Sequence, residues 1–229
     1  MREIVLDTET TGFEPGEGDR IVEIGAVELM NHVATGRTYH QYINPERSMP
    51  ADAFAVHGLG DEFLADKPVF KEVGQAFLDF IADDKLVIHN AAFDMKFLSA
   101  ELEWMGLAPL PMERAVDTLA IARRKFPGSP ASLDALCRRF GIDNSNRTLH
   151  GALLDSEILA EVYLELIGGR QPGMMLEAAS RASGPSASDW RPSPRPRPLP
   201  SRVTPAEAER HAAFVAGLGE DAVWSTVTS

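Results

Sequence analysis

The sequence predicts an α/β domain in which helices pack on a mixed β-sheet. Three β-type runs come first, and helical and β-type segments alternate after them. That order is typical of a sheet covered by helices, not of a helix bundle or a β-sandwich. With 229 residues, 44% of them apolar, the chain can bury the core of one sizeable domain or of two small ones.

Apolar and β-branched residues mark the strands. The first strand is an apolar run that begins at Arg2 and ends in the acidic stretch Asp7-Thr8-Glu9. After a Gly/Pro-rich loop over 13–20, two further strands are expected over 21–29 and 38–43. A short apolar strand over 86–89 and a brief one over 115–117 complete the expected sheet.

Helical periodicity and capping residues mark the helices. The recurrence of Val69, Val73, Phe77 and Ile81 predicts an amphipathic helix. Asn90 and Ser132 are expected to cap helices with their side chains, and a glycine at 141 to end one. The remaining helices are expected over 91–105, 118–125, 133–140 and 151–167, with only short helical turns between 44 and 68.

The composition changes abruptly near residue 168. Five of the ten residues from 191 to 200 are proline, which predicts an extended, disordered linker. Helix formers and apolar residues return near the end, where Trp224 would be exposed without a partner. We therefore expect a folded domain over 1–170, a flexible linker over 171–203 and a docking segment over 204–229, with a frayed tail as the simpler alternative for the last part.

The net charge of −12 lies entirely in the first 170 residues, because the six basic and six acidic residues after them cancel. An acidic domain does not bind nucleic acid through its surface charge alone, so a polyanionic substrate would require bound cations or a delivering partner. No signal peptide or membrane-spanning run is recognisable. The single cysteine, Cys137, fits a reducing compartment and a core position, so the expected location is the cytoplasm.

Asp7 and Glu9 follow an apolar run and stand two positions apart. Alternate residues of a strand point to one face, so the two carboxylates would lie side by side if the strand continues that far. Like charges at that separation repel, and a divalent cation with a preference for oxygen ligands, Mg²⁺ or Mn²⁺, would relieve the repulsion. This stretch alone leaves a turn with two solvated carboxylates as the alternative.

Two more acids stand at ordered positions. Asp94 falls in the first turn of the helix that follows the 86–89 strand, and Asp155 falls in the last long helix, five residues after His150. Taken singly, Asp94 is also explained by its favourable interaction with a helix N-terminus, and His150 as a loop histidine. Their combination with Asp7 and Glu9 is far more specific.

The order Asp7-x-Glu9, Asp94 and His150-x₄-Asp155 resembles the DEDDh family of 3′–5′ exonucleases. The resemblance extends to the proofreading (epsilon) subunits of bacterial DNA polymerase III and covers about residues 1–170. It is carried by the segments 5–12, 24–27, 56–58, 87–94, 132–137, 141–145 and 148–155.

The resemblance implies a ribonuclease H-like fold with a central five-stranded mixed sheet and a site for two divalent ions, Mg²⁺ or Mn²⁺. By resemblance, Asp7 bridges both ions, and Glu9 and Asp155 help hold the ion that binds the attacking water. Asp94 supports the second ion. His150 is the general base, a role that suits an imidazole near neutral pH.

The nucleotide-binding residues are also implied by resemblance. The 3′-terminal nucleotide would lie against residues of the first loop, with two aromatic rings near its base or sugar. Asp52 stands where the family usually has a glutamate that touches the 3′ hydroxyl. The residues concerned are Thr8, Thr10, Thr11, Gly12, Phe13, Asp52, His57 and Phe93.

The segment 171–176 resembles the short peptide by which such subunits bind a sliding clamp, with Gln171, Met174 and Leu176 as its contacts. The expected partners are therefore the 3′ end of DNA, the polymerase catalytic (alpha) subunit through 204–229, the clamp and a small theta-type subunit. The expected function is removal of mismatched 3′-terminal nucleotides. A free-standing RNA-trimming exonuclease and an inactive structural subunit of the polymerase are the alternatives.

Overall fold

The computed structural model describes residues 1–147, 149–169 and 203–218. The first two ranges belong to one compact unit and the third to another, and each is described by itself. Within these ranges, no helix has both the length and the apolar character needed to cross a membrane.

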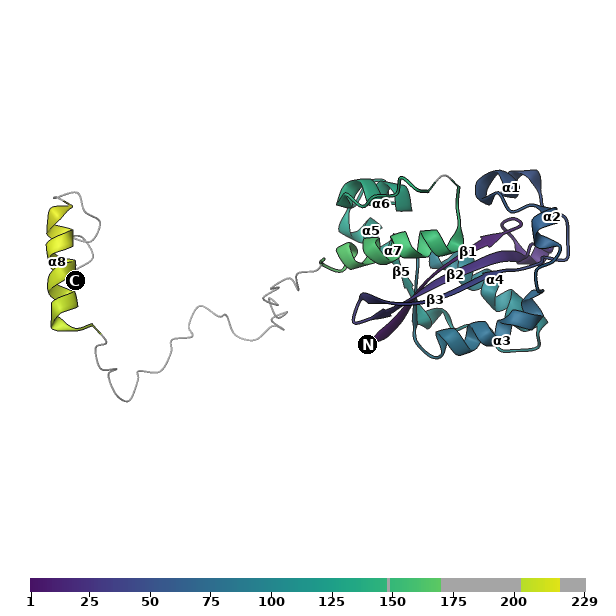
Figure 1. The fold of residues 1–229 in the computed structure, drawn as a ribbon, viewed down its shortest axis with the longest axis horizontal. Coiled ribbons are helices and arrows are strands. Elements are labelled where there is room, and N and C mark those ends of the chain that lie inside the picture. The colour runs from purple at the N-terminus through teal and green to yellow at the C-terminus, as the bar shows by residue number, and fades with distance from the viewer. Residues whose placement is uncertain (148, 170–202, 219–229) are drawn as a thin grey trace, which may run out of the picture. The chain divides into compact units, whose positions relative to one another are not determined.

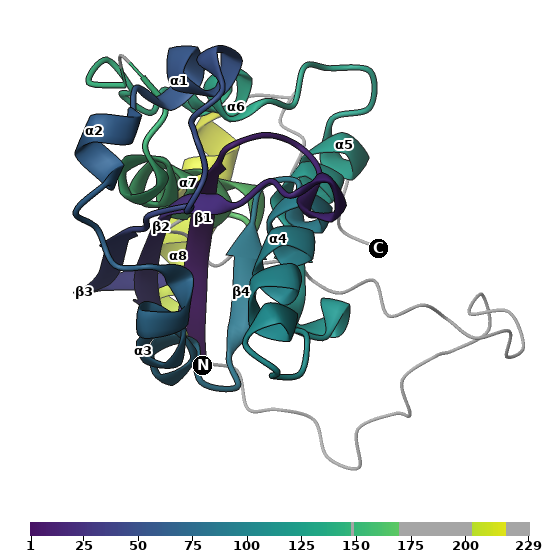
Figure 2. The ribbon, with the colours of Figure 1, turned by 90° about the vertical axis from the view of Figure 1, so that its right-hand side faces the viewer.

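A five-stranded sheet with the order β3-β2-β1-β4-β5 forms the centre of the first unit (Figure 1). β1 is antiparallel to β2 and β2 to β3, whereas β4 is parallel to β1 and β5 to β4. The predicted mixed sheet is thus confirmed, and β1 lies between β2 and β4 (Figure 2). The strands are β1 Arg2–Thr10, β2 Ile21–Met30, β3 Val33–Tyr42, β4 Lys85–Ile88 and β5 Ala115–Asp117.

β3 begins at Val33, well before the predicted start at residue 38. The hairpin between β2 and β3 turns at Asn31 and His32, whose φ angles of 52° and 66° are both positive. Positive φ at both turn residues is typical of the tight turn that matches strand twist. The prediction was wrong because the Asn-His pair lacks the glycine by which such turns are usually recognised.

Helices cover both faces of the sheet, with α7 on one face and α3 on the other (Figure 1). Ser132 caps α6 as predicted, since its Oγ accepts a hydrogen bond from the Ala135 N–H at 3.3 Å. The helices are α1 Ala51–His57, α2 Asp61–Leu64, α3 Phe70–Ile81, α4 Ala91–Trp104, α5 Thr118–Lys125, α6 Leu133–Phe140 and α7 Ala152–Leu166, with 3₁₀ turns at Pro15–Glu17 and Met112–Arg114.

The side-chain cap predicted for Asn90 is wrong. Asn90 precedes α4, but its backbone is left-handed, with φ 68°, and its side chain accepts no capping hydrogen bond. Its own N–H donates to Asp117 Oδ1 at 3.2 Å instead. Asparagine tolerates this conformation because its short polar side chain adds little strain there.

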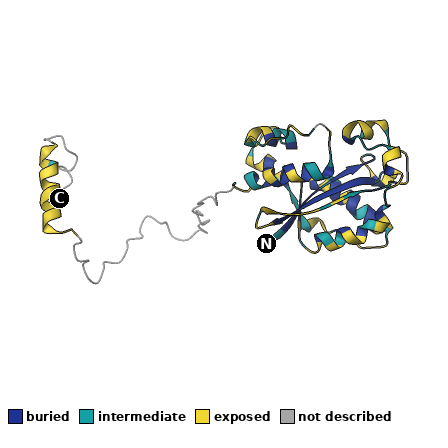
Figure 3. Ribbon diagram, in the orientation of Figure 1, coloured by how far each residue is buried: buried dark blue, intermediate teal, exposed yellow. Residues whose placement is uncertain are grey.

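β1 contributes to two separate hydrophobic cores. Ile4 and Leu6 are fully buried among side chains of α3 and α4, whereas Val5 packs with residues of α5, α6 and α7. Figure 3 shows β1 and β2 buried, while the outer surfaces of the helices and much of β3 are exposed. The pairing of β1 with β2 is regular as far as Glu9, so Asp7 and Glu9 share the face of Val5, and Thr8 shares the face of Leu6.

α7 approaches β2 so closely that only glycine fits at position 25. A Cβ atom on Gly25 would lie 2.1 Å from the backbone nitrogen of Leu153 and 2.2 Å from the carbonyl carbon of Ala152. The Ser156 hydroxyl donates to the Gly25 carbonyl at 2.9 Å. The start of α7, which carries Asp155, is therefore fixed directly against the sheet.

The second unit contains helix α8, Pro205–Gly217. Thr204 and Glu207 form a capping box, because the Glu207 N–H donates to Thr204 Oγ1 at 3.3 Å and the Thr204 N–H donates to Glu207 Oε2 at 2.8 Å. The side chain of Phe214 is 64% exposed. The start of α8 is thus stabilised by its own capping residues, and the helix exposes the ring of Phe214.

Candidate active site

The five predicted catalytic residues line one pocket of about 590 Å³. They come from β1, from the start of α4, from the loop before α7 and from the first turn of α7. Thr8 and Phe93 line the same pocket. The acids and the histidine converge there although more than 140 positions separate the first from the last.

Asp94 is held in place by the end of β1. The Thr8 N–H donates to Asp94 Oδ1 at 3.1 Å, and Thr8 Oγ1 donates to the same oxygen at 2.7 Å. Both residues are buried. The side chain of Thr8, predicted to touch the nucleotide, is thus committed to orienting an acid.

Glu9, His150 and Asp155 form a cluster with the spacing of a metal site, since one potential ligand atom of each lies within 4.8 Å of the others. Glu9 Oε1 is buried and has no hydrogen-bond partner in the described part of the chain. A buried carboxylate oxygen without a partner is costly unless an ion completes its coordination. The oxygen-rich donor set therefore fits a divalent metal ion.

The site disfavours negative charge when no metal is bound. Burial, with the charges of Asp94, Glu9 and Asp155, raises the pKa of Asp7 well above its usual range. Burial is also the main cause that raises the pKa of Glu9 to about 8 and of Asp94 to about 7. Burial opposes ionisation of Asp155 too, but the neighbouring His150 and the hydrogen bonds donated by Arg147 outweigh it and lower the pKa.

Arg147 is the main residue that sequence reasoning missed. Its Nε donates to Asp155 Oδ1 at 2.5 Å, its Nη2 to Asp155 Oδ2 at 2.7 Å, and its Nη1 to Asp134 Oδ1 at 2.9 Å. The only sequence signal for it was a basic residue three positions before His150 in a polar loop. Asp134, Arg123 and His89, which were also not predicted, line the same pocket.

The loop that carries His150 is tied to α1. The His150 N–H donates to the Val56 carbonyl at 3.1 Å. The neighbouring His57 is buried, and its Nδ1 accepts from the Leu59 N–H at 3.1 Å. His57 therefore lies close to the His150 loop without lining the pocket itself.

The other predicted nucleotide contacts lie outside the residues that line the pocket. Thr10 Oγ1 donates to the Gly12 carbonyl at 2.6 Å, and Thr11 Oγ1 donates to Asp19 at 3.1 Å. Asp52 is exposed in the first turn of α1. Phe13 is 81% exposed and its ring lies 6.3 Å from that of Phe93, so an aromatic pair stands beside the pocket.

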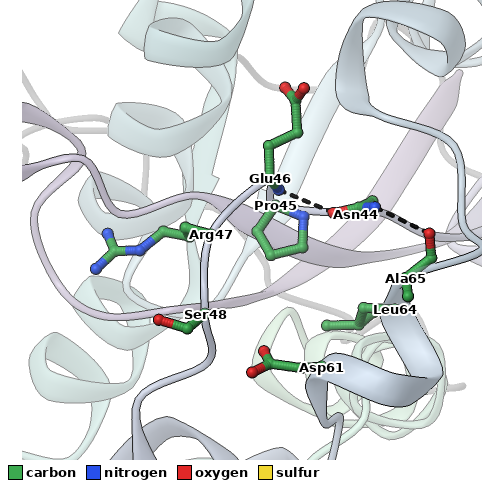
Figure 4. A pocket seen from close by; sticks show the side chains of 8 residues that line it. All are labelled: Asn44, Pro45, Glu46, Arg47, Ser48, Asp61, Leu64 and Ala65. Atoms are coloured by element: carbon green, nitrogen blue, oxygen red, sulfur yellow. Dashed lines mark hydrogen bonds between the residues drawn. The ribbon is translucent and has the colours of Figure 1, made fainter.

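A second depression, of about 360 Å³, lies between the loop after β3 and α2 (Figure 4). Asn44 bridges the Ala65 carbonyl and the Glu46 N–H across it. Asp61 accepts a hydrogen bond from the Met49 N–H at 2.6 Å. Since these polar groups bind one another and none of the predicted catalytic residues lies there, the larger pocket is the candidate active site.

The predicted clamp contacts Gln171, Met174 and Leu176 lie outside the described residues, as do the predicted linker up to residue 202 and residues 219–229.

The metal-free protein is expected to become less stable as the pH rises from about 5 to about 9. The pKa values of Glu9 and Asp94 in the folded protein, about 8 and about 7, exceed those of unfolded carboxyls. At a pH between the unfolded and the folded pKa of each group, the folded state binds more protons than the unfolded state, so the free energy of unfolding falls as the pH rises. This loss of stability is complete above the folded pKa. Thermal unfolding in EDTA should show a Tm that falls by several degrees, and saturating Mg²⁺ should reduce this fall. A metal-free Tm that is constant or rises over this range would contradict the prediction.

Comparison with known proteins identifies relatives of this chain. The family model described as exonuclease matches residues 4–163. The DNA polymerase III subunit epsilon of Rickettsia felis is 49% identical over 222 residues, which cover 95% of this chain and 97% of the relative.

Among solved structures, exonuclease X in complex with 5′ overhanging duplex DNA matches with a TM-score of 0.58 and 26% identity, over 72% of this chain and 90% of its own. The nuclease domain of 3′hExo, a DEDDh family member bound to rAMP, has a TM-score of 0.61 at 20% identity, over 72% of this chain and 91% of its own. The ribonuclease H-like exonuclease fold implied by the sequence is thereby confirmed. The chain belongs to the exonuclease family and, within it, to the epsilon subunits of DNA polymerase III.

Proposed function

We propose that this protein is a two-metal-ion 3′–5′ exonuclease that removes mismatched 3′-terminal nucleotides from DNA as the proofreading subunit of a replicative polymerase. The observation that carries the proposal is the convergence of Asp7, Glu9, Asp94, Asp155 and His150 on one pocket. The epsilon subunit that is 49% identical over nearly the whole chain supports the polymerase context.

The carboxylates would hold two divalent ions, Mg²⁺ or Mn²⁺. Burial raises the pKa of Asp7, and the charges of Asp94, Glu9 and Asp155 raise it further, so Asp7 interacts with all three of the other acids. Asp7 would therefore help to hold both ions, Glu9 and Asp155 would help to hold one of them, and Asp94 would support the other. When bound, such ions lower the pKa of the attacking water and offset the charge on the leaving oxygen.

Residues of the chain itself would deprotonate the attacking water and hold the metal-binding carboxylates in position. His150 accepts the proton of the water that attacks the terminal phosphate, and its exposed position beside the pocket leaves room for substrate. The bond from phosphorus to the 3′ oxygen of the penultimate nucleotide breaks, which releases a nucleoside 5′-monophosphate. Thr8 keeps Asp94 oriented throughout, since both of its donors bind that carboxylate.

The test is release of nucleoside monophosphates from a primer with a mismatched 3′ end. The purified full chain is expected to release them with Mg²⁺ and to stop in EDTA, and a mismatched DNA end should be degraded faster than a paired one. A folded, metal-supplied protein that releases nothing would leave only the structural role. Preference for single-stranded RNA over DNA would favour the RNA-trimming alternative.

The polymerase catalytic subunit is the proposed partner of residues 204–229. A capped helix that exposes Phe214 and Leu218 offers apolar surface for such a contact. Deleting residues 190–229 is expected to abolish co-elution with the polymerase subunit in gel filtration and to leave hydrolysis of a mismatched primer within about twofold of the full chain, because the pocket is built from residues before 170. Retained co-elution would contradict the assignment.

Two further partners are proposed on the sequence alone. Residues 171–176 would bind the sliding clamp, so replacing Gln171 and Met174 by alanine should weaken clamp binding in surface plasmon resonance without changing polymerase binding. A small theta-type subunit would bind the folded domain. A replication complex of this kind works in the bacterial cytoplasm, and the buried Cys137 is compatible with that reducing compartment. Co-purification identifies these partners directly.

A further inference from the structure

The side chain of Arg147 occupies the position beside Asp155 in which a metal ion would be bound. The Arg147 guanidinium binds both carboxylate oxygens of Asp155, at 2.5 Å and 2.7 Å, and the Arg147 side chain is only 8% exposed. This two-pronged contact is the strongest geometry available to an arginine and a carboxylate. A metal ligand is thus already neutralised by a protein cation.

The same guanidinium determines the state of His150. Arg147 Nη2 lies 2.8 Å from His150 Nδ1. A guanidinium can only donate hydrogen bonds, so Nδ1 must accept, and a neutral ring then carries its proton on Nε2. In this arrangement neither nitrogen is free to take a proton from water.

Removing Arg147 from this position would reverse the arrangement. His150 Nδ1 lies 3.3 Å from Asp155 Oδ2, a distance at which a proton on Nδ1 can be donated to the carboxylate. Nε2 would then present its lone pair to the pocket. A hydrogen bond from one ring nitrogen to a carboxylate is a common way in which one tautomer of a histidine is fixed.

Arg147 has a second anchor that would retain it nearby. Its Nη1 donates to Asp134 Oδ1 at 2.9 Å, and the Asn144 side-chain amide donates to the same oxygen at 2.9 Å. Asp134 lies in the first turn of α6, and its side chain is 45% exposed. The arginine can therefore leave Asp155 and still pair with a carboxylate.

We propose that Arg147 is an internal counter-ion that occupies the Asp155 side of the metal centre when no metal is bound and that a divalent ion must displace it. Displacement frees both oxygens of Asp155 and lets His150 adopt the tautomer with an accepting Nε2. Arg147 is thus a positioning residue that links metal binding to activation of the base. This inference rests on the proposed metal-dependent function.

The first test is Mn²⁺ titration of the full chain, followed by electron paramagnetic resonance. Arg147→Gln is expected to bind Mn²⁺ about tenfold more tightly than the unmodified protein, because a charge-assisted competitor is removed. Its metal-free form should unfold at a lower temperature in EDTA. Arg123→Gln is the matched control, since Arg123 lines the same pocket and, in the described part of the chain, forms no ion pair with Asp155. It should change the affinity by less than about threefold.

Arg147→Lys provides a second variant if Arg147→Gln does not fold. Lysine keeps the positive charge but cannot span both oxygens of a carboxylate, so Mn²⁺ should still bind more tightly than to the unmodified protein. An affinity that is unchanged or weaker in both Arg147 variants overturns the proposal, and so does an equal gain in Arg123→Gln.

The second test is the tautomer of His150, measured by NMR of histidine labelled with ¹³C and ¹⁵N, with His150→Gln to assign the signal. In the neutral, metal-free protein the proton is expected on Nε2, and in Arg147→Gln on Nδ1. A proton on Nδ1 in the unmodified metal-free protein overturns the proposal. If the unmodified protein binds no Mn²⁺ and releases no nucleotide, the proposed function falls as well; if it does both and the variants show no gain, only this inference fails.

Discussion

Replacing Asp7 by asparagine is expected to lower the rate of nucleotide release from a mismatched primer by at least about 10³-fold, because bound ions contribute several kcal/mol of charge stabilisation to such reactions. Asparagine has the size of aspartate but carries no charge and is a poor ligand for a hard cation. Asp7 interacts with Asp94, Glu9 and Asp155, so its loss affects the whole centre. Single-turnover hydrolysis at saturating Mg²⁺ measures the effect.

The same substitution is expected to stabilise the metal-free protein. The pKa of Asp7 is raised mainly by burial, which means that the charged form is unfavourable in the folded state at neutral pH. A rise in Tm in EDTA together with the loss of activity would therefore separate a functional acid from a structural one. Asp79→Asn, at an exposed position on α3, is the control and should change neither quantity. Retention of more than about a tenth of the rate by Asp7→Asn would show that the site assignment is wrong.

Gly25→Ala is expected to lower both stability and activity, although residue 25 bears no functional group. The added methyl carbon would lie 2.1 Å from the Leu153 nitrogen, far inside contact distance, so the start of α7 must move away from β2. Overpacking of this kind costs about 1–3 kcal/mol, which corresponds to a fall of several degrees in Tm for a domain of this size. Because Asp155 stands in the first turn of α7, we expect a loss of about tenfold or more in hydrolysis, since small displacements of catalytic groups are costly.

Differential scanning calorimetry and the primer assay measure the two effects together. Gly16→Ala is a suitable control, because its nearest neighbour beyond the adjoining residues is Glu14 Oε1 at 3.5 Å, an ordinary contact. Excess Mn²⁺ should restore part of the stability of Gly25→Ala without restoring the full rate. Normal stability and activity in Gly25→Ala would mean that α7 is not held by this contact.

Local patterns in the sequence were sufficient to predict most of the fold. The hydrophobic periodicity of 69–81 and the apolar run before Asp7 are strong signals, and both elements form as expected. Ser132 caps its helix as predicted, because its hydroxyl oxygen can accept a hydrogen bond from a backbone N–H in the first turn just after it. Asn90 does not cap α4 with its side chain, because its backbone is left-handed, and its N–H donates to Asp117, which is distant in the sequence.

The four acids and His150 that we propose as catalytic could be selected from the sequence because their order and local settings are distinctive, and all five line one pocket. Arg147 could not, since its importance depends on two partners, Asp134 and Asp155, that only the fold brings together. The directions of Asp52 and of the Thr10 and Thr11 hydroxyls, which lie outside the residues that line the pocket, are likewise not contained in a motif, and their contacts with a nucleotide stay predictions. Contacts between distant parts of the chain determine where these side chains point, whereas the spacing of the four acids and His150 can be read along the chain.

The alternation of β1 between two cores makes the active site sensitive to the length of one strand. Ile4 and Leu6 anchor one face and Val5 the other, and all three are fully buried. Deleting or inserting a single residue between Val5 and Asp7 would place the carboxylates on the α4 face and Thr8 on the α7 face, because the side-chain period of a strand is two. A change in the length of this strand by one residue would therefore remove the carboxylates from the pocket and polar side chains would enter the core at the same time, so the metal ligands and the core of this strand depend on one register.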